Sequence, residues 1–95
     1  MAKMSFNVSQ VYKHLQDYGH VNTVRSYWYE PYSVAEVEGI GKVQRTMRAV
    51  IDGPDDLEPY LEDSGFVTIE EWWRAITSFE NHGRKRWVYY VEVVS

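Results

Sequence analysis

The segment that most constrains the fold is residues 86–94, because it has the composition of a strand and is apolar on both faces. Successive side chains of a strand point to opposite faces. This alternation places Trp87, Tyr89, Val91 and Val93 on one face and Val88, Tyr90 and Val94 on the other. Such a strand has to be covered on two sides. Closure of the sheet into a barrel would explain why a C-terminal strand, normally a fraying edge, is this hydrophobic.

Three further segments have the composition of strands. Residues 22–29 are dominated by β-branched and aromatic residues and lie between Gly19 and Pro31. A shorter strand is expected at 33–37, followed by a flexible corner at 39–41 that predicts a bulge or a barrel bend. A long strand is expected at 42–51. Its alternation predicts one face made of Val43, Arg45, Met47, Ala49 and Ile51.

Two segments have the apolar spacing of helices. For residues 8–18, Asn7 with Gln10 resembles a capping box, and Gly19 suits the left-handed residue that closes a helix. For residues 69–80, Thr68 and Glu71 form the same box. The buried stripe of this second helix includes Trp72 and Ile76, which are expected to share one core with the last strand. A short helical turn is expected at 57–62 and should end at Gly65.

These elements predict one α+β domain over residues 1–95, with a small curled sheet or β-barrel flanked by two helices and a short helical turn. A chain of 95 residues can bury a single core without metal or disulfide staples. The absence of cysteine excludes disulfides and thiolate catalysis, and it fits a reducing compartment. We find no apolar run long enough to span a membrane and no signal-peptide pattern. The sequence therefore predicts a cytoplasmic protein without a membrane partner.

The charges are segregated along the chain. The net charge is −4, yet residues 52–80 carry nine acids against the single base Arg74, so this segment alone is −8. The rest of the chain is +4. Because binding responds to the local potential rather than to the total charge, a basic patch on this acidic protein is compatible with an anionic partner.

The sequence offers no strong signature of catalysis or of metal binding. The three histidines, His14, His20 and His82, lack the i, i+4 spacing of a helical zinc site, and we expect them to be solvated helix and loop residues. We find neither a phosphate-binding loop nor a local nucleophile motif. The sequence therefore predicts no metal, no cofactor and no identified catalytic residue.

Two clusters are typical of nucleic-acid contact. Arg25, Tyr27 and Tyr29 share one face of the expected strand at 22–29, where rings can stack on bases and a guanidinium can pair with phosphate. The second cluster is a basic loop that enters the last strand and consists of Arg84, Lys85 and Arg86. Arg45 and Arg48 add positive charge. Packing of the tyrosines and of the arginine stems is the alternative for each of these side chains.

The turn at 19–25 carries a family resemblance. Gly19 followed by Thr23-Val24-Arg25, after a short N-terminal helix, resembles the ASCH branch of the PUA-like superfamily. The segment 65–72 and the aromatic strand that begins at Trp87 look like further features of that family. The resemblance covers most of the chain and implies a small PUA-like β-barrel whose cleft binds RNA or a modified nucleobase.

The same resemblance also implies a catalytic alternative. Some relatives are amidohydrolases that remove an acyl group from cytidine with a lysine, a threonine and a glutamate. Here His20, Val21 and Asn22 stand where the family turn usually has lysine, and Thr23 has no identified activator. Binding without catalysis is therefore the leading hypothesis.

Three functions remain open from the sequence. The first is a non-catalytic, PUA-like module that binds RNA or a nucleotide-like ligand. The second is a nucleoside amidohydrolase that uses Thr23 with Glu36, or with Glu30 or Glu38 in its place. The third is an adaptor for a basic protein partner, in which the acidic segment 52–80 is the working surface.

Overall fold

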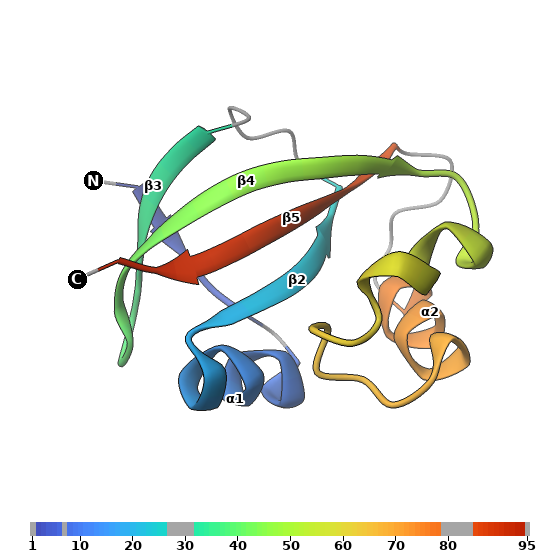
Figure 1. Cartoon of the computed structure of the whole chain (residues 1–95), viewed down its shortest axis with the longest axis horizontal. Helices are drawn as coiled ribbons and strands as arrows, with labels where there is room; N and C mark the ends of the chain where they lie inside the picture. Colours follow the sequence, from blue (N-terminus) through green and yellow to red (C-terminus); the bar gives the residue numbers. More distant parts are fainter. Residues whose placement is uncertain (1, 7, 27–31, 79–84, 95) are drawn as a thin grey trace.

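The structure is a computed structural model, and it describes residues 2–6, 8–26, 32–78 and 85–94. Its elements follow one another along the chain as shown in Figure 1. They are β1 (Ala2–Met4), α1 (Ser9–Tyr18), β2 (His20–Arg25), β3 (Tyr32–Val37), β4 (Gly41–Ile51), the 3-10 helix η1 (Pro54–Tyr60), α2 (Ile69–Thr77) and β5 (Arg86–Val93).

The five strands form one mixed sheet in the order β1-β3-β4-β5-β2. β1 runs parallel to β3, and the other neighbours are antiparallel. Among the described residues β1 and β2 do not pair with each other, so the sheet is not closed into a barrel. The α+β class is confirmed, and the open sheet is compatible with the expected curled sheet rather than with its barrel alternative.

β5 lies inside the sheet, between β4 and β2. Val88, Tyr89 and Val91 are fully buried, which confirms that this strand is covered on both faces. The apolar character of β5 therefore follows from its interior position and does not require barrel closure. Trp72 and Ile76 belong to the same hydrophobic core as Tyr89, as the sequence predicts.

The helices differ from their predicted bounds mainly at their ends. α1 begins at Ser9 with Val8, and not Asn7, as its N-cap. Asn7 lies outside the described residues, so its predicted capping box with Gln10 is not tested. Gly19 closes the helix in the left-handed conformation, with φ of 79°, as expected. The cap of α2 is also confirmed, because Thr68 Oγ1 accepts a hydrogen bond of 3.1 Å from Glu71 N.

α2 ends at Thr77, before the predicted end at residue 80, and residues 79–80 lie outside the described residues. The helical turn predicted at 57–62 is present as η1 but begins earlier, at Pro54. A β-bulge between Met47 and Ala49 changes the faces of β4. Met47 pairs with Tyr89 and Ala49 pairs with Val88, which point to opposite faces. The prediction that Ala49 and Ile51 share a face with Met47 is therefore wrong.

Two strand connections also differ from expectation. Residues 39–41 are neither a bulge nor a barrel bend but the tight turn that joins β3 to β4, closed by a 3.0 Å bond from Ile40 N to Val37 O. Gly39 and Gly41 have φ of 83° and 116°, which explains the choice of glycine. β2 ends at Arg25, Ser26 is a bend rather than strand, and the rest of the predicted strand, 27–29, falls outside the described residues.

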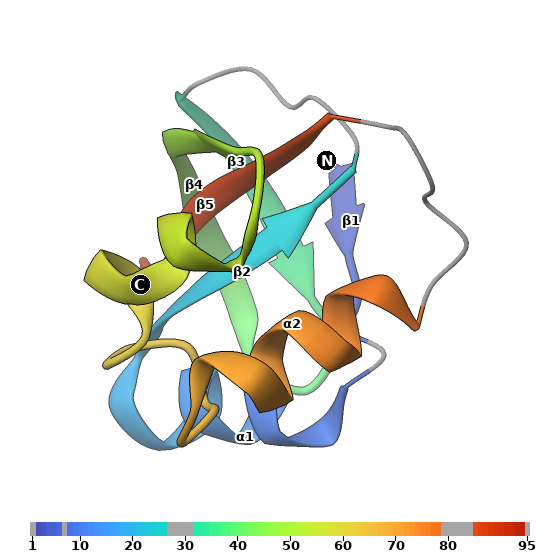
Figure 2. The same ribbon diagram turned by 90° about the vertical axis from the view of Figure 1, so that its right-hand side faces the viewer.

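The helices cover different parts of the sheet. α1 lies below β2, whereas η1 and α2 lie together near the end of β4 (Figure 1). Turned by 90°, the molecule shows η1 and α2 in front of the sheet (Figure 2). Within the described part of the chain, no helix has both the length and the apolar character needed to cross a membrane.

Candidate functional site

Arg25, the centre of the first predicted cluster, holds two elements together. Its Nη2 donates a hydrogen bond of 2.7 Å to Ser5 O, and its guanidinium lies 4.8 Å from the centroid of the Phe6 ring. These contacts tie β2 to the segment between β1 and α1. Tyr27 and Tyr29 lie outside the described residues, so their predicted grouping with Arg25 is not tested.

Two other predicted arginines are also engaged inside the fold. Arg45 is buried, and its Nε donates a 3.0 Å hydrogen bond to Ser33 Oγ. Arg86 places its guanidinium 5.4 Å from the centroid of the Trp73 ring. Lys85 is exposed, whereas Arg84 lies outside the described residues. The predicted basic loop is thus only partly described.

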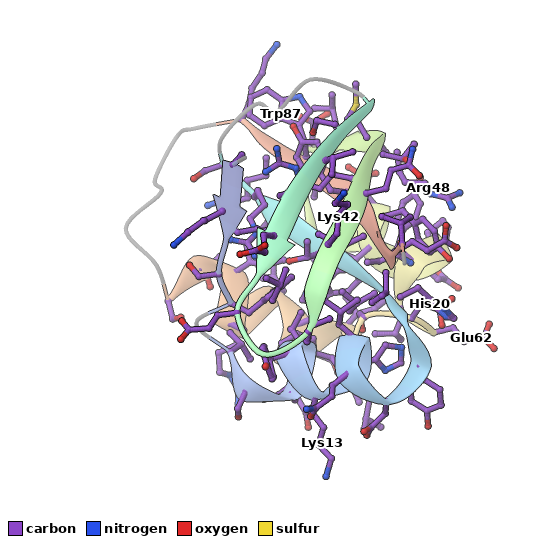
Figure 3. All side chains as sticks on the ribbon, turned by 90° about the vertical axis from the view of Figure 1, so that its left-hand side faces the viewer. Lys13, His20, Lys42, Arg48, Glu62 and Trp87 are labelled. Carbon is purple, nitrogen blue, oxygen red and sulfur yellow. The ribbon has the colours of Figure 1, made fainter. Side chains whose placement is uncertain are left out.

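Arg48 is different, because it is exposed and lies over an aromatic ring. Its guanidinium is 4.6 Å from the centroid of the Tyr90 ring, at the bulge of β4. On the other strand next to β5, His20 stacks on Tyr90 with a centroid distance of 5.8 Å and an interplanar angle of 30°. Arg48, Tyr90 and His20 therefore form a row across β4, β5 and β2, which we call the Tyr90 row. Figure 3 shows Arg48 and His20 on the same side of the molecule.

The phenol of Tyr90 is held in its neutral form. Burial raises its pKa above the ordinary value of tyrosine, and the carboxylate of Glu92 raises it further, while Arg48 acts in the opposite direction. The hydroxyl donates a long hydrogen bond of 3.4 Å to Glu92 Oε2. At neutral pH the Tyr90 row therefore carries the positive charge of Arg48 over an uncharged ring, and the carboxylates of Glu92 and Asp63 border it.

A second group of polar side chains adjoins this row. His20 Nε2 lies 3.1 Å from Asp63 Oδ1, and His14 Nε2 lies 3.6 Å from the same oxygen. His14 belongs to α1, His20 begins β2, and Asp63 follows η1, so three different segments meet here. We call His14, His20 and Asp63 the His–Asp cluster. One ligand atom from each residue lies within 4.8 Å of the other two, so the cluster has the spacing needed to hold a metal ion.

The cluster corrects the expectation that these histidines are solvated helix and loop residues. The His14 side chain is only 14% exposed, and the half-buried His20 lies in a strand. His82 lies outside the described residues. Helical i, i+4 spacing is therefore the wrong test for this chain, because the imidazoles come from two different elements.

Thr23 and Glu36, the residues of the catalytic alternative, do not lie together. Thr23 is buried and pairs with Tyr89, whose face of the sheet continues through β4 to Ala35. Glu36 is the next residue after Ala35 and therefore points to the opposite face, where it is exposed. Of the alternative bases, Glu38 is exposed beyond β3, and Glu30 lies outside the described residues.

A shallow, open pocket of about 490 Å³ lies between β1 and the end of β3. Its lining includes Lys3, Glu36 and Glu38 but none of the predicted basic residues. Among the described residues, its lining also lacks an aromatic side chain on which a base could stack. This pocket therefore does not replace the Tyr90 row as a candidate nucleotide site.

Most acidic side chains of segment 52–80 are exposed to solvent. Among the described residues of this segment, seven acids are exposed and Asp63 is half-buried in the His–Asp cluster; Glu80 lies outside the described residues. The exposed acids are Asp52, Asp55, Asp56, Glu58, Glu62, Glu70 and Glu71. They lie in η1, in the first turn of α2 and in the segments on either side of η1.

Comparison with protein-family models, with curated proteins and with solved structures finds no match to this chain. Sequence reasoning did not single out Tyr90 or the His–Asp cluster as a site. For two residues of the His–Asp cluster the sequence did carry a signal of proximity, because Gly19 reverses the chain between His14 and His20. For Asp63, 43 residues beyond His20, the sequence carries no comparable signal.

Proposed function

We propose that this protein is a non-catalytic, PUA-like module that binds RNA or a nucleotide-like ligand, and that the Tyr90 row is its contact surface. The observation that carries the proposal is the exposed guanidinium of Arg48 held 4.6 Å above the Tyr90 ring. The resemblance at 19–25 supports the ligand class. The absence of cysteine supports a cytoplasmic location.

The chemistry of the row suits a nucleotide. A guanidinium donates paired hydrogen bonds to phosphate or to a base edge. Arg48 replaces Arg25 in this role, because Arg25 already donates to Ser5 O. Tyr90 packs against both Arg48 and His20 and so holds these two side chains in place.

The separation of Thr23 from Glu36 supports binding without catalysis. A threonine nucleophile needs an adjacent base, and Thr23 and Glu36 point to opposite faces of the sheet. We therefore expect no hydrolysis of acylated cytidine above the uncatalysed rate. A chromatographic assay of product formation checks this, and turnover that is abolished by Thr23→Ala would contradict it.

We expect weak, salt-dependent RNA binding, with dissociation constants of roughly 10⁻⁴ to 10⁻⁶ M at physiological salt. Arg48→Ala should reduce the slope of log affinity against log salt by about 0.7, the value of one phosphate contact in a single strand. Tyr90→Leu should weaken binding by about fivefold or more, because Arg48 and His20 lose the ring that holds them in place. Fluorescence anisotropy with labelled single-stranded RNA in the presence of EDTA measures both effects.

Lys13→Ala is the matched control, because Lys13 is an exposed base on α1 that points away from the Tyr90 row (Figure 3). It should leave affinity nearly unchanged. Chemical-shift mapping with RNA, DNA and free nucleosides should perturb Arg48, Tyr90 and His20. If these residues do not respond at low salt, or if Lys13→Ala costs as much as Arg48→Ala, the proposed surface is wrong.

A second candidate function rests on the exposed carboxylates of residues 52–80. Their density suits a basic protein partner, since complementary charge steers association. The same mapping experiment with a lysine-rich peptide separates the two functions. Shifts confined to η1 and α2, together with silence at Tyr90, would favour the adaptor.

A further inference from the structure

We propose that the His–Asp cluster binds a zinc ion through His14 Nε2, His20 Nε2 and Asp63 Oδ1, with a fourth coordination position left for water or an exogenous ligand. This inference does not depend on RNA binding. It adds a metal site whose ligands come from α1, β2 and the segment after η1.

The distances fit a tetrahedral ion. Zinc binds imidazole nitrogen and carboxylate oxygen at about 2.0–2.2 Å, which places two ligand atoms of a tetrahedron about 3.3 Å apart. The two measured separations to Asp63 Oδ1 are 3.1 Å and 3.6 Å, one on each side of this value. The ligand atoms of His14 and His20 lie within 4.8 Å of each other, so all three atoms are close enough to converge on one ion.

The ligand set selects the metal class. Two imidazoles and one carboxylate suit zinc and related transition metals, whereas calcium and magnesium prefer oxygen ligands alone. Three protein ligands with one open position are typical of zinc sites that bind water or substrate. At the cluster the Asp63 side chain is 42% exposed, so solvent has access to the site.

His14 supplies an independent observation. Its Nε2 is buried and has no hydrogen-bond partner among the described residues, and the nearby Asp63 oxygen lies beyond hydrogen-bond distance at 3.6 Å. An unsatisfied buried polar atom is costly and requires an explanation. A bound metal ion would satisfy it, because the lone pair of the neutral imidazole would become a ligand.

The fold holds the three ligands in place before any ion binds. Asn22 N donates a 2.6 Å hydrogen bond to Asp63 O, which fixes the backbone of Asp63 against the free edge of β2. The next residue, Ser64, is fully buried, and its hydroxyl donates to Leu61 O.

The imidazoles are held by aromatic neighbours as well as by their own elements. The rings of His14 and Tyr18 lie 4.6 Å apart, and His20 stacks on Tyr90. A preorganised site of this kind loses little conformational entropy on binding.

The test uses the full chain, stripped of metal with EDTA and then desalted. Calorimetric titration with zinc chloride should give one site per chain, and zinc should raise the midpoint of thermal unfolding. Cobalt(II) should give the intense visible absorption of a tetrahedral complex. Magnesium chloride should do none of this. Absent zinc binding, or equal binding of magnesium, would overturn the proposal.

The variants His14→Gln, His20→Gln and Asp63→Asn remove one ligand each while nearly preserving side-chain size. Each should weaken zinc binding by more than about tenfold, since even the loss of a group behind a ligand costs about 10- to 100-fold. Circular dichroism of the metal-free variants shows which of them fold. Zinc binding by any one folded variant is enough to test the site.

Asp17→Asn and His82→Gln serve as controls, because they remove an exposed carboxylate of α1 and the remaining histidine while leaving all three ligands intact. Both should bind zinc like the original chain. Undiminished zinc binding by folded Asp63→Asn and His14→Gln would overturn the site. The RNA titrations contain EDTA, so the outcomes for the two sites are separable.

Discussion

Trp72→Ala should lower the free energy of unfolding by about 3–5 kcal/mol. Trp72 is 2% exposed in α2 and stacks on Phe66 with a centroid distance of 6.1 Å. Removing the indole leaves a cavity in the core that η1, α2 and the sheet share, and the surrounding backbone can fill it only in part. Because a domain of this size has about 5–15 kcal/mol of stability in total, the variant should be close to unfolding.

Urea denaturation followed by circular dichroism measures this loss. Val67→Ala is the control, because Val67 is 82% exposed just before α2 and its truncation should change stability by no more than about 0.5 kcal/mol. A loss below about 1 kcal/mol for Trp72→Ala would contradict the burial of this helix face.

Gly65→Ala should lower the free energy of unfolding by about 2–5 kcal/mol. Gly65 has φ of +87°, which costs a residue with a Cβ about 1–2 kcal/mol. In addition, a Cβ at this position would lie 2.7 Å from the backbone oxygen of Gln10 in α1. A backbone oxygen inside a helix cannot move aside cheaply, so the loop after η1 would have to leave α1.

Two other glycines separate these contributions. Gly19 has φ of +79° but open space around its Cβ position, so Gly19→Ala should show the conformational cost alone. Gly53 has an extended backbone with φ of −162° and open space, so Gly53→Ala should be nearly neutral. Thermal and urea unfolding of the three variants test this order. Equal losses for Gly65→Ala and Gly19→Ala would show that the close packing against α1 is wrong.

For the arginines predicted to contact nucleic acid, the sequence specifies the residue type but not the accessibility of the side chain. The sequence shows where the arginines are, but it does not show whether a guanidinium already contacts other groups of the fold and is therefore not available to a ligand. Arg25 donates to a backbone carbonyl, and Arg45 is buried beside Ser33. Arg48 differs from both only in its place at the β4 bulge, which brings it over Tyr90. A bulge is a property of two paired strands, so the alternation of a single strand does not reveal it.

The sequence by itself determined the elements whose signals are local. Apolar spacing and Gly19 fix α1, Thr68 fixes the start of α2, and the two-sided apolar pattern of residues 86–94 requires a covered strand. These signals act within one helical turn or one strand, where the chain's own stereochemistry decides the outcome.

Only the tertiary structure decided the rest. β1 is three residues long, too short to show a period, and it exists through its parallel pairing with β3. The His–Asp cluster joins residues 14, 20 and 63, and its geometry depends on the bond from Asn22 N to Asp63 O and on the close approach of Gly65 to α1. Bringing residues this far apart in the sequence together costs chain entropy. Only the burial of apolar side chains across the whole core offsets that cost, so these contacts form when the core assembles.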